Sequence, residues 1–291
     1  MSDKKSKTMS KLQESRLKTM KQKEETITGL LTTTKNNPNF VKLLVFTLNT
    51  LENFVSPPNR EIRVNGSVII RLEGVGILHT IIIKNINKDE IVTKAGEIIW
   101  KLISVYNNLD PELAKLFAEK NGHKLIIEIL VKRQKGPFEV ISSYIKVLNG
   151  LAQIPQLVPS LLDSGLVDTF NFEEENLDMI SLNLDTLKKL SNQKVGRDFL
   201  ISKNFVEKII KNIKISSQKN SMDSVLCGLS ILDNLSRNEE GKQAIKESGG
   251  IDCLSEVLDV MGHVDYLIRM SSKIYGKIAI ANDMKSQIES L

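Results

Sequence analysis

The sequence has few of the residues on which disulfide-rich and metal-binding proteins depend. Its 291 residues include two cysteines and three histidines, so we expect neither a disulfide framework nor a cysteine-based zinc site. No apolar run reaches the roughly 18 residues of a membrane-spanning helix, and no apolar segment of a secretory signal precedes the rest. These absences predict an intracellular protein, in which Cys227 and Cys253 are core residues of apolar helices.

Motifs that carry chemistry are also lacking. The three histidines, His79, His123 and His263, have no second ligand at a metal-binding spacing. The segment Gly74-Val75-Gly76 begins like a dinucleotide-binding loop but lacks its third glycine. The sequence contains no P-loop and no nucleophile elbow. We therefore expect a protein that is not an enzyme and that holds neither a metal nor a cofactor.

Basic residues are concentrated at the N-terminus. Residues 1–23 carry eight basic side chains against two acidic ones, a net charge of +6, whereas the whole chain is +5. The remaining residues therefore sum to −1. The basic residues are Lys4, Lys5, Lys7, Lys11, Arg16, Lys18, Lys21 and Lys23. Few apolar residues interrupt this segment, so we expect residues 1–25 to form a mostly flexible tail and residues 26–291 to form the folded domain.

The partner of such a tail is an anionic surface. A tubulin lattice or an acidic protein would suit its charge. Nucleic acid is not favoured, because aromatic side chains are not interleaved with the lysines. A mitochondrial presequence would be rich in arginine and poor in acids, whereas this tail is rich in lysine and contains Asp3.

The folded part contains an internal repeat. The segment from Leu229 to Ile251 matches that from Leu184 to Phe205: a helix ending in Leu-Ser, a polar turn, a short helix, a break and a new apolar helix. The breaks are Gly76, Gly122, Gly165, Asn204 and Gly250, which are 46, 43, 39 and 46 residues apart. This spacing is typical of armadillo and HEAT repeats, and glycine and asparagine suit a helix end with a left-handed backbone.

The short helix expected over Glu239 to Glu247, and the third-helix ending Asn234-Leu235-Ser236, give a resemblance to the armadillo repeat family. The resemblance covers about residues 40–291. It implies an all-α fold, a right-handed α-solenoid of about five to six three-helix repeats. The last repeat is incomplete: Ile274 to Ala279 matches a third-helix ending and Asn282 to Ile288 the next short helix. Because the sequence shows no polar cap there, we expect this end to be completed by a partner or by further chain.

The resemblance also implies a binding groove lined by the third helices. Two positions in each helix, four residues apart and so on one face, would line it. They are Asn49 and Asn53, Trp100 and Ser104, Lys146 and Gly150, Asp185 and Lys189, Ser230 and Asn234, and Lys273 and Lys277. The nuclear-import adaptors of the family carry Trp and Asn together at these positions, whereas no repeat here carries both. Trp100 could equally be a core residue.

Two functional hypotheses follow. The first is a non-catalytic, protein-binding scaffold in a large assembly, with cytoskeletal, ciliary-axonemal or microtubule-associated location. The alternative is a soluble transport or signalling adaptor that binds a linear peptide in the groove. The mixed Lys, Asn and Ser composition of the groove favours a protein partner of acidic or neutral character. No membrane association is expected.

Overall fold

The structure is a computed structural model of the whole chain. It describes residues 18, 21–37, 39–57, 59, 61–106, 108–170 and 176–289, without the side chains of Val167 and of residues 280–289. The chain divides into two compact units, Met1–Leu125 and Ile126–Leu291, and each is described by itself.

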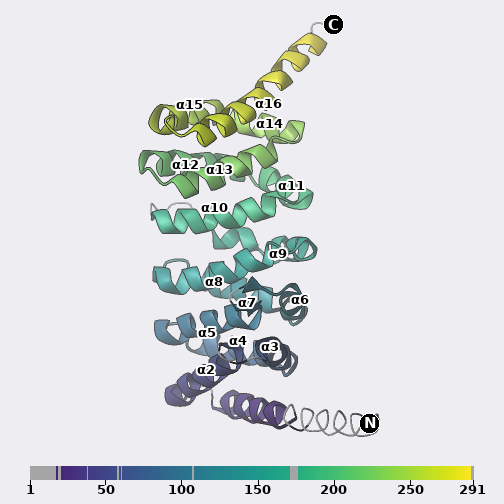
Figure 1. Cartoon of the computed structure of the whole chain (residues 1–291), viewed down its shortest axis with the longest axis vertical. Helices are drawn as coiled ribbons and strands as arrows, with labels where there is room; N and C mark the ends of the chain where they lie inside the picture. Colours follow the sequence, from purple (N-terminus) through teal and green to yellow (C-terminus); the bar gives the residue numbers. More distant parts are fainter. Residues whose placement is uncertain are drawn as a thin grey trace, which may run out of the picture. The chain divides into compact units, whose positions relative to one another are not determined.

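The first unit is helical apart from one small hairpin (Figure 1). A helix over 21–36 precedes the labelled elements. The elements that follow are α2 (Val41–Val55), α3 (Ile62–Arg71), α4 (Gly74–Lys84), α5 (Asp89–Leu102), β1 (Ser104–Val105), β2 (Asn108–Leu109) and α6 (Pro111–Glu119). The strands β1 and β2 pair antiparallel. Helix α7 (Gly122–Lys132) runs across the division between the units.

The second unit continues the same order of a short helix, a second helix and a long third helix. Its elements are α8 (Phe138–Leu151), η1 (Pro155–Leu157), α9 (Val158–Asp163), η2 (Leu166–Thr169), α10 (Leu177–Ser191), α11 (Lys194–Ser202), α12 (Phe205–Gln218), α13 (Met222–Leu235), α14 (Glu239–Glu247), α15 (Gly250–Met261) and α16 (Asp265–Glu289). The third helices α8, α10, α13 and α16 follow one another side by side (Figure 1). Between α9 and α10 the second helix is reduced to the 3-10 turn η2.

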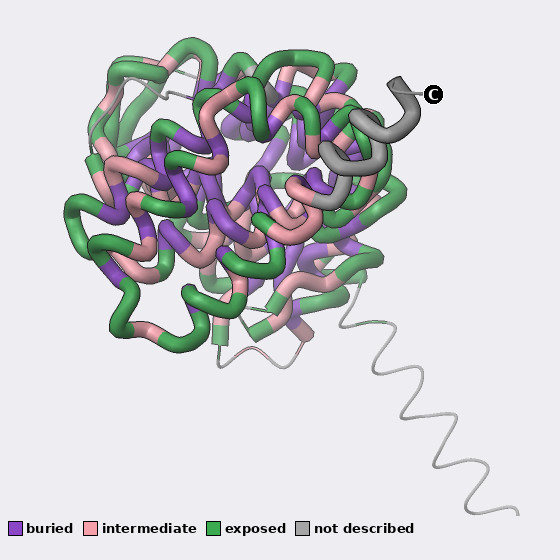
Figure 2. The backbone as a smooth tube through the Cα atoms, turned by 90° about the horizontal axis from the view of Figure 1, so that it is seen from above, coloured by how far each residue is buried: buried purple, intermediate pink, exposed green. Residues whose placement is uncertain are grey.

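One burial pattern recurs in four third helices and defines their register. Counting back from Leu102, Leu151, Leu190 or Leu235, which we call the reference residue, the residues at 0, 3, 4, 6, 7, 10 and 11 are buried. Figure 2 shows these buried stretches on the inner sides of the helices, with exposed stretches outside. Positions 0, 4, 7 and 11 form one stripe and positions 3, 6 and 10 another. Each of these helices therefore buries two adjoining faces.

Left-handed residues separate the short and second helices, as the repeat predicts. They are Glu73, Asn121, Gly165, Asn204 and Gly249, with φ between 56° and 83°. The predicted breaks at Gly165 and Asn204 are confirmed. Those at Gly122 and Gly250 lie one residue late, because these glycines begin α7 and α15. The break placed at Gly76 lies three residues late, because the left-handed residue there is Glu73.

Glycine is required where the short helices α11 and α14 cross the ends of α10 and α13. A Cβ on Gly241 would lie 1.9 Å from the carbonyl oxygen of Leu235, and one on Gly196 would lie 2.1 Å from that of Leu190. Both glycines stand six residues after the reference residue. Only a residue without a side chain allows this close approach of two backbones.

The predicted boundary at residue 25 falls inside the helix over 21–36 and is wrong for residues 21–25. Ile27, Leu31 and Thr34 are buried, and the hydroxyl groups of Thr34 and Thr47 are 2.6 Å apart in a hydrogen bond. These contacts hold the helix against α2 because its apolar residues recur every three to four positions. Of the predicted tail, residues 1–17, 19 and 20 lie outside the described residues.

Two further expectations concern local structure. The apolar run Ile81-Ile82-Ile83 lies in α4, so its interpretation as a buried second helix is confirmed. The short helix expected over Asn282 to Ile288 is wrong as a separate element, because α16 continues unbroken to Glu289. Taken singly, none of the described helices is long and apolar enough to cross a membrane; α3 and α4 pass that test only as a pair, which bends by 73°.

Candidate functional site

In the second unit the predicted groove positions fall on four successive third helices. Five residues and one residue before the reference residue are Lys146 and Gly150 on α8, Asp185 and Lys189 on α10, and Ser230 and Asn234 on α13. Helix α16 is buried at 0, 4, 7 and 11 counted from Ile278, so Lys273 and Lys277 hold the same positions. Lys146 and Lys273 are exposed, whereas Gly150 and Asn234 are buried.

The predicted pair Trp100 and Ser104 is wrong in register. Helix α5 ends at Leu102, and Ser104 is a buried residue of the hairpin strand β1. The backbone leaves the helix because Asp110 N–H donates to the carbonyl of Ile103 (2.9 Å), which closes the hairpin. Measured from Leu102, the two outward positions of α5 are Glu97 and Lys101. Trp100 is half-buried on the side of the helix between them and the core.

In the first unit, Asn49 and Asn53 are exposed on α2. One turn before Asn49 on the same face lies Phe46, whose side chain is 61% exposed. The sequence prediction missed it because only two positions per helix were considered. Beside this face, the Glu52 carboxylate accepts hydrogen bonds from Lys94 and Lys101 of α5.

A polar contact between successive third helices recurs in the second unit. Asn149, two residues before the reference residue of α8, donates to the Asp185 carboxylate of α10 (2.9 Å). Asp233, at the same position of α13, accepts from Lys273 (2.9 Å) and Lys277 (2.7 Å) of α16. In the first unit the Glu52 carboxylate of α2 likewise accepts from Lys101 of α5. Several predicted groove residues thus hold neighbouring helices together.

Asn234 has a similar role. Its side-chain amide donates to the hydroxyl of Ser191 and to Oδ1 of Asn192 on α10, both at 3.0 Å. Since Asn234 is also buried, its amide N–H groups link α10 to α13. They do not point freely into a groove.

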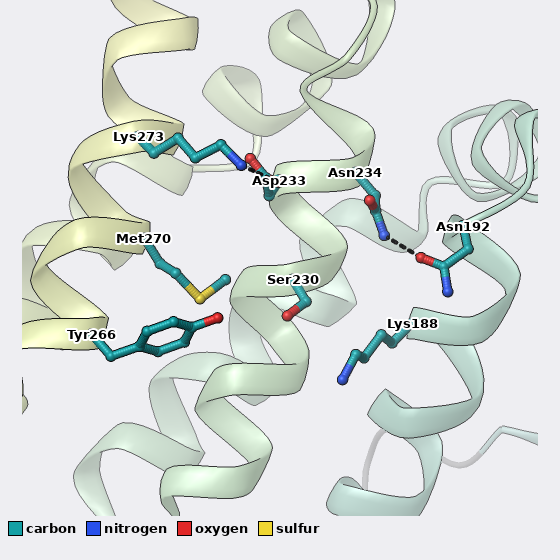
Figure 3. A pocket seen from close by; sticks show the side chains of 8 residues that line it. All are labelled: Lys188, Asn192, Ser230, Asp233, Asn234, Tyr266, Met270 and Lys273. Atoms are coloured by element: carbon teal, nitrogen blue, oxygen red, sulfur yellow. Dashed lines mark hydrogen bonds and ion pairs between the residues drawn. The ribbon is translucent and has the colours of Figure 1, made fainter.

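A pocket of about 300 Å³ opens between α10, α13 and α16. Its lining residues are Lys188, Asn192, Ser230, Asp233, Asn234, Tyr266, Met270 and Lys273. In Figure 3, Tyr266 and Met270 project from one side and Lys188 from the other, with Ser230 between them. We call this set of residues the pocket surface. It joins an apolar wall to a basic one.

The charges around the pocket leave it positive. Burial would raise the pKa of Asp233, but the hydrogen bonds from Lys277 and Lys273 outweigh that effect and hold the pKa below its ordinary value. Asp233 is therefore ionised at neutral pH and compensates one of the two lysines. Lys188 has no ion-pair partner among the described residues. The excess positive charge favours an anionic or carbonyl-rich ligand.

Sequence reasoning placed Ser230, Asn234 and Lys273 in the groove, and the structure brings these three together. It missed Lys188, Asn192, Asp233, Tyr266 and Met270. The helical period could have found two of these, because Met270 and Tyr266 stand three and seven residues before Lys273 on the same face. Lys188 and Asp233 lie between the two groove positions and the core, where sequence pattern alone gives no sign of exposure.

No family model and no curated protein matches the sequence. Solved structures do match. A designed armadillo repeat protein in complex with the peptide (KR)4 superimposes with a TM-score of 0.68 at 13% identity, over 87% of this chain and 99% of the other. Computationally designed armadillo repeat proteins for modular peptide recognition give the same score and identity, over 86% and 99%.

These matches decide the fold. It is an armadillo-type repeat fold. The predicted all-α solenoid of three-helix repeats is thereby confirmed. A structure from a study of a phosphorylation switch in the interaction between cadherin and beta-catenin matches with a TM-score of 0.60 at 14% identity, over 84% of this chain and 50% of that one. At such identities the armadillo matches establish the fold alone.

The side chains of the pocket surface can bind a ligand through hydrogen bonds and apolar contacts. Lysine, asparagine, serine and tyrosine side chains offer hydrogen-bond donors and acceptors, and Met270 offers a deformable apolar contact. Within the described residues no group of three metal-ligating side chains forms. His123 is buried in the first unit. This burial lowers the pKa of His123, and the nearby charge of Lys124 lowers it further.

Proposed function

We propose that the chain is a non-catalytic, protein-binding scaffold that holds an extended segment of a partner against α10, α13 and α16. The observation that carries the proposal is the pocket of about 300 Å³, to which three successive third helices each contribute side chains. Concave sites with an apolar wall and a few convergent polar groups are the usual form of a binding site.

The lining side chains select the chemistry of the partner. Tyr266 and Met270 would contact an apolar side chain, and Lys188 would pair with a carboxylate or a backbone carbonyl. The designed relative binds the basic peptide (KR)4. The uncompensated positive charge here disfavours such a peptide, so the proposed partner segment is acidic or neutral with one apolar anchor.

The test is recovery of partners from native extract followed by chemical cross-linking and mass spectrometry. We expect Lys188→Glu and Tyr266→Ala to lose the partner that the unchanged chain retains. Lys211→Glu, on the exposed face of α12, is the matched control and should retain it. Partner recovery that is equal in all four proteins would contradict the proposal.

A finer proposal concerns where the scaffold acts. The basic charge of residues 1–23 favours an anionic lattice, and we place the protein in the cytoplasm on the cytoskeleton, with a microtubule-associated or ciliary-axonemal role. A truncation should stop at residue 17, because residues 21–36 form the helix packed on α2. Co-sedimentation with microtubules should fall several-fold on this truncation and with added salt. Equal sedimentation of the truncated chain and the full chain would contradict the cytoskeletal role.

The pocket also supports the second candidate, a soluble transport or signalling adaptor, because a linear peptide would fill it without a larger assembly. Cell fractionation separates the two. A scaffold remains with an insoluble particle after detergent extraction, whereas an adaptor is recovered in the soluble fraction.

A further inference from the structure

The pocket surface holds two separate positive charges, one on each side of α13. Lys188 comes from α10 and has no ion-pair partner among the described residues. Lys273 comes from α16, and its Nζ donates to Oδ2 of Asp233 at 2.9 Å. Because Lys277 binds the other carboxylate oxygen of Asp233 at 2.7 Å, these three groups together keep one positive charge. In Figure 3, Lys188 and Lys273 project on opposite sides of Ser230.

Two further carboxylates near the pocket are offset by neighbouring bases. Asp185 of α10 accepts from Lys189 at 2.6 Å, so this pair is neutral. Asp265 of α16 is exposed beside the pocket, and Arg269 follows it one turn later on the same stripe. Opposite charges at that spacing on a helix attract and offset each other. Neither pair changes the two positive charges of the pocket surface.

The remaining charged residues of the described parts of these three helices are Asp178 of α10 and Asp223 of α13, both exposed. Asp178 precedes Lys188 by ten residues and Asp223 precedes Ser230 by seven, which correspond to about 15 Å and about 10 Å along the helices. These separations exceed the Debye length of about 8 Å at physiological ionic strength. Both carboxylates therefore weaken the positive potential of the pocket only slightly.

Two separated charges suit two carboxylates better than one doubly charged group. A phosphoryl group concentrates about two negative charges at one point, where it would contact one lysine, because the other projects from the far side of α13. Neighbouring packed helices lie about 8–10 Å apart. Lysines that reach inward from the first and third helices therefore suit carboxylates about 13 Å apart, which corresponds to four residues of extended chain.

The apolar wall determines what lies between the two carboxylates. Tyr266 is 56% exposed, and Met270 is half-buried one turn later on the same face of α16. Both side chains project toward Ser230 (Figure 3). Alternate side chains of an extended segment point to the same side, so the residue midway between the carboxylates faces this wall. An apolar side chain there would be buried against the ring of Tyr266 and the thioether of Met270.

We propose that the pocket surface binds an extended segment in which two acidic residues, four positions apart, flank an apolar residue. Lys188 pairs with one carboxylate and Lys273 with the other, while Asp233 holds Lys273 in place. This inference rests on the proposed function, and it adds the pattern of charges by which the partner segment is selected.

The probe is a set of four fluorescein-labelled peptide pools with leucine at the centre of the pattern and alanine, serine or threonine beside it. The first pool carries glutamate at both ends of the pattern, two pools carry glutamine at one end, and the fourth carries glutamine at both ends. Fluorescence anisotropy with the full chain at physiological salt measures each Kd. We expect each glutamate to tighten binding about three- to fivefold.

Substitutions identify which lysine binds which carboxylate. Lys188→Gln should remove the preference for glutamate at one end of the pattern only, and Lys273→Gln should remove it at the other end. Lys211→Gln, on the exposed face of α12, is the matched control and should keep both preferences. Circular dichroism of each variant verifies folding.

The outcomes separate this inference from the proposed function. Equal binding of all four pools, lost in Tyr266→Ala, would overturn the pattern of two carboxylates and leave the proposed function standing. A preference for glutamate that survives in both lysine variants would overturn the roles of Lys188 and Lys273. Absence of binding by every pool would overturn the inference, whereas recovery of partners from native extract decides the proposed function.

Discussion

The carboxylate of Asp233 on α13 accepts a hydrogen bond of 2.7 Å from Nζ of Lys277 on α16. Lys273, one turn earlier, donates to the other carboxylate oxygen at 2.9 Å. Glu52 of α2 binds Lys101 and Lys94 of α5 in the same way. In both cases a carboxylate near the end of one third helix forms ion pairs with two lysines of the next third helix. These ion pairs add a directional contact to apolar packing that alone would let the helices slide.

The first prediction is that Asp233→Asn lowers the free energy of unfolding by about 1–2 kcal/mol, because two charge-assisted hydrogen bonds to a partly buried carboxylate are lost. Urea unfolding followed by circular dichroism measures the change. Asp198→Asn, an exposed carboxylate of α11, should change it by less than about 0.5 kcal/mol. Equal effects of the two substitutions would show that the contact to α16 does not stabilise the fold.

The same contact predicts a dependence on pH. The pKa of Asp233 is lowered in the folded chain: burial acts to raise it, but the bonds from Lys277 and Lys273 prevail. A lowered pKa means that the stabilisation is complete above the ordinary value of 3.8 and is lost as the pH falls through the folded value. The stability difference between the unchanged chain and Asp233→Asn should therefore be constant from pH 5 to 7 and shrink below about pH 4. A difference at pH 3 that is as large as the difference at pH 7 would contradict it.

Gly241 predicts a steric effect. Alanine there would place Cβ 1.9 Å from the carbonyl oxygen of Leu235, so α14 must shift, at a cost of about 1–3 kcal/mol. The matched control is Gly276→Ala on α16, where a Cβ meets nothing within 4 Å. That substitution should stabilise the chain by up to about 1 kcal/mol, because alanine favours the helix. Thermal unfolding of the two variants should give shifts of opposite sign.

The order of helices could be predicted from the sequence because two copies of the repeat show the same order. Leu190-Ser191 and Leu235-Ser236 end third helices, and glycine stands six residues after each leucine, where the structure allows no side chain. Asn204 and Gly165 were identified as helix ends because their types favour a left-handed backbone. In these repeats local preference and tertiary packing require the same residues.

The register of α5 could not be predicted in the same way. The segment from Leu102 to Tyr106 offers both Leu102 and Val105 as the last core residue, and the hairpin that ends the helix at Leu102 depends on a bond between Asp110 and Ile103. Only the seven-position burial pattern decides between them. The pocket was missed for a related reason, since Lys188 and Asp233 become neighbours of α16 only through packing between helices.

Glu73 has a left-handed backbone conformation, with φ at 60°, which a glutamate does not favour. Glycine adopts this backbone without steric cost, so Glu73→Gly should raise the free energy of unfolding by about 0.5–1 kcal/mol. Glu73→Val should lower it, because a β-branched residue is strained there. Chemical unfolding of both variants measures the difference. The exposed ion pair of Glu73 with Lys35, at 3.7 Å, is too weak to reverse the sign.

The two cysteines should differ in reactivity. Burial raises the pKa of Cys253 to about 12, the nearby Lys214 opposing the shift only in part, and its Sγ lies 3.9 Å from the carbonyl oxygen of Ile210. Cys227, predicted as a core residue, is half-buried, and burial also raises its pKa. The thiolate is the reactive form, so at pH 8 a thiol reagent such as dithiobis(nitrobenzoic acid) should modify Cys227 slowly and Cys253 only as the chain unfolds.

The measurement is the number of thiols that react with time, by absorbance and by mass spectrometry of the modified peptides. Cys227→Ser should remove the faster phase and leave a phase whose rate equals the unfolding rate in the same buffer. Cys253→Ser should leave the faster phase unchanged. Urea at the unfolding midpoint should accelerate the slow phase to the rate of the fast one, because Cys253 is protected by the packing of α15 on α12. Two phases that respond equally to urea would show that the second unit does not bury Cys253 between these helices.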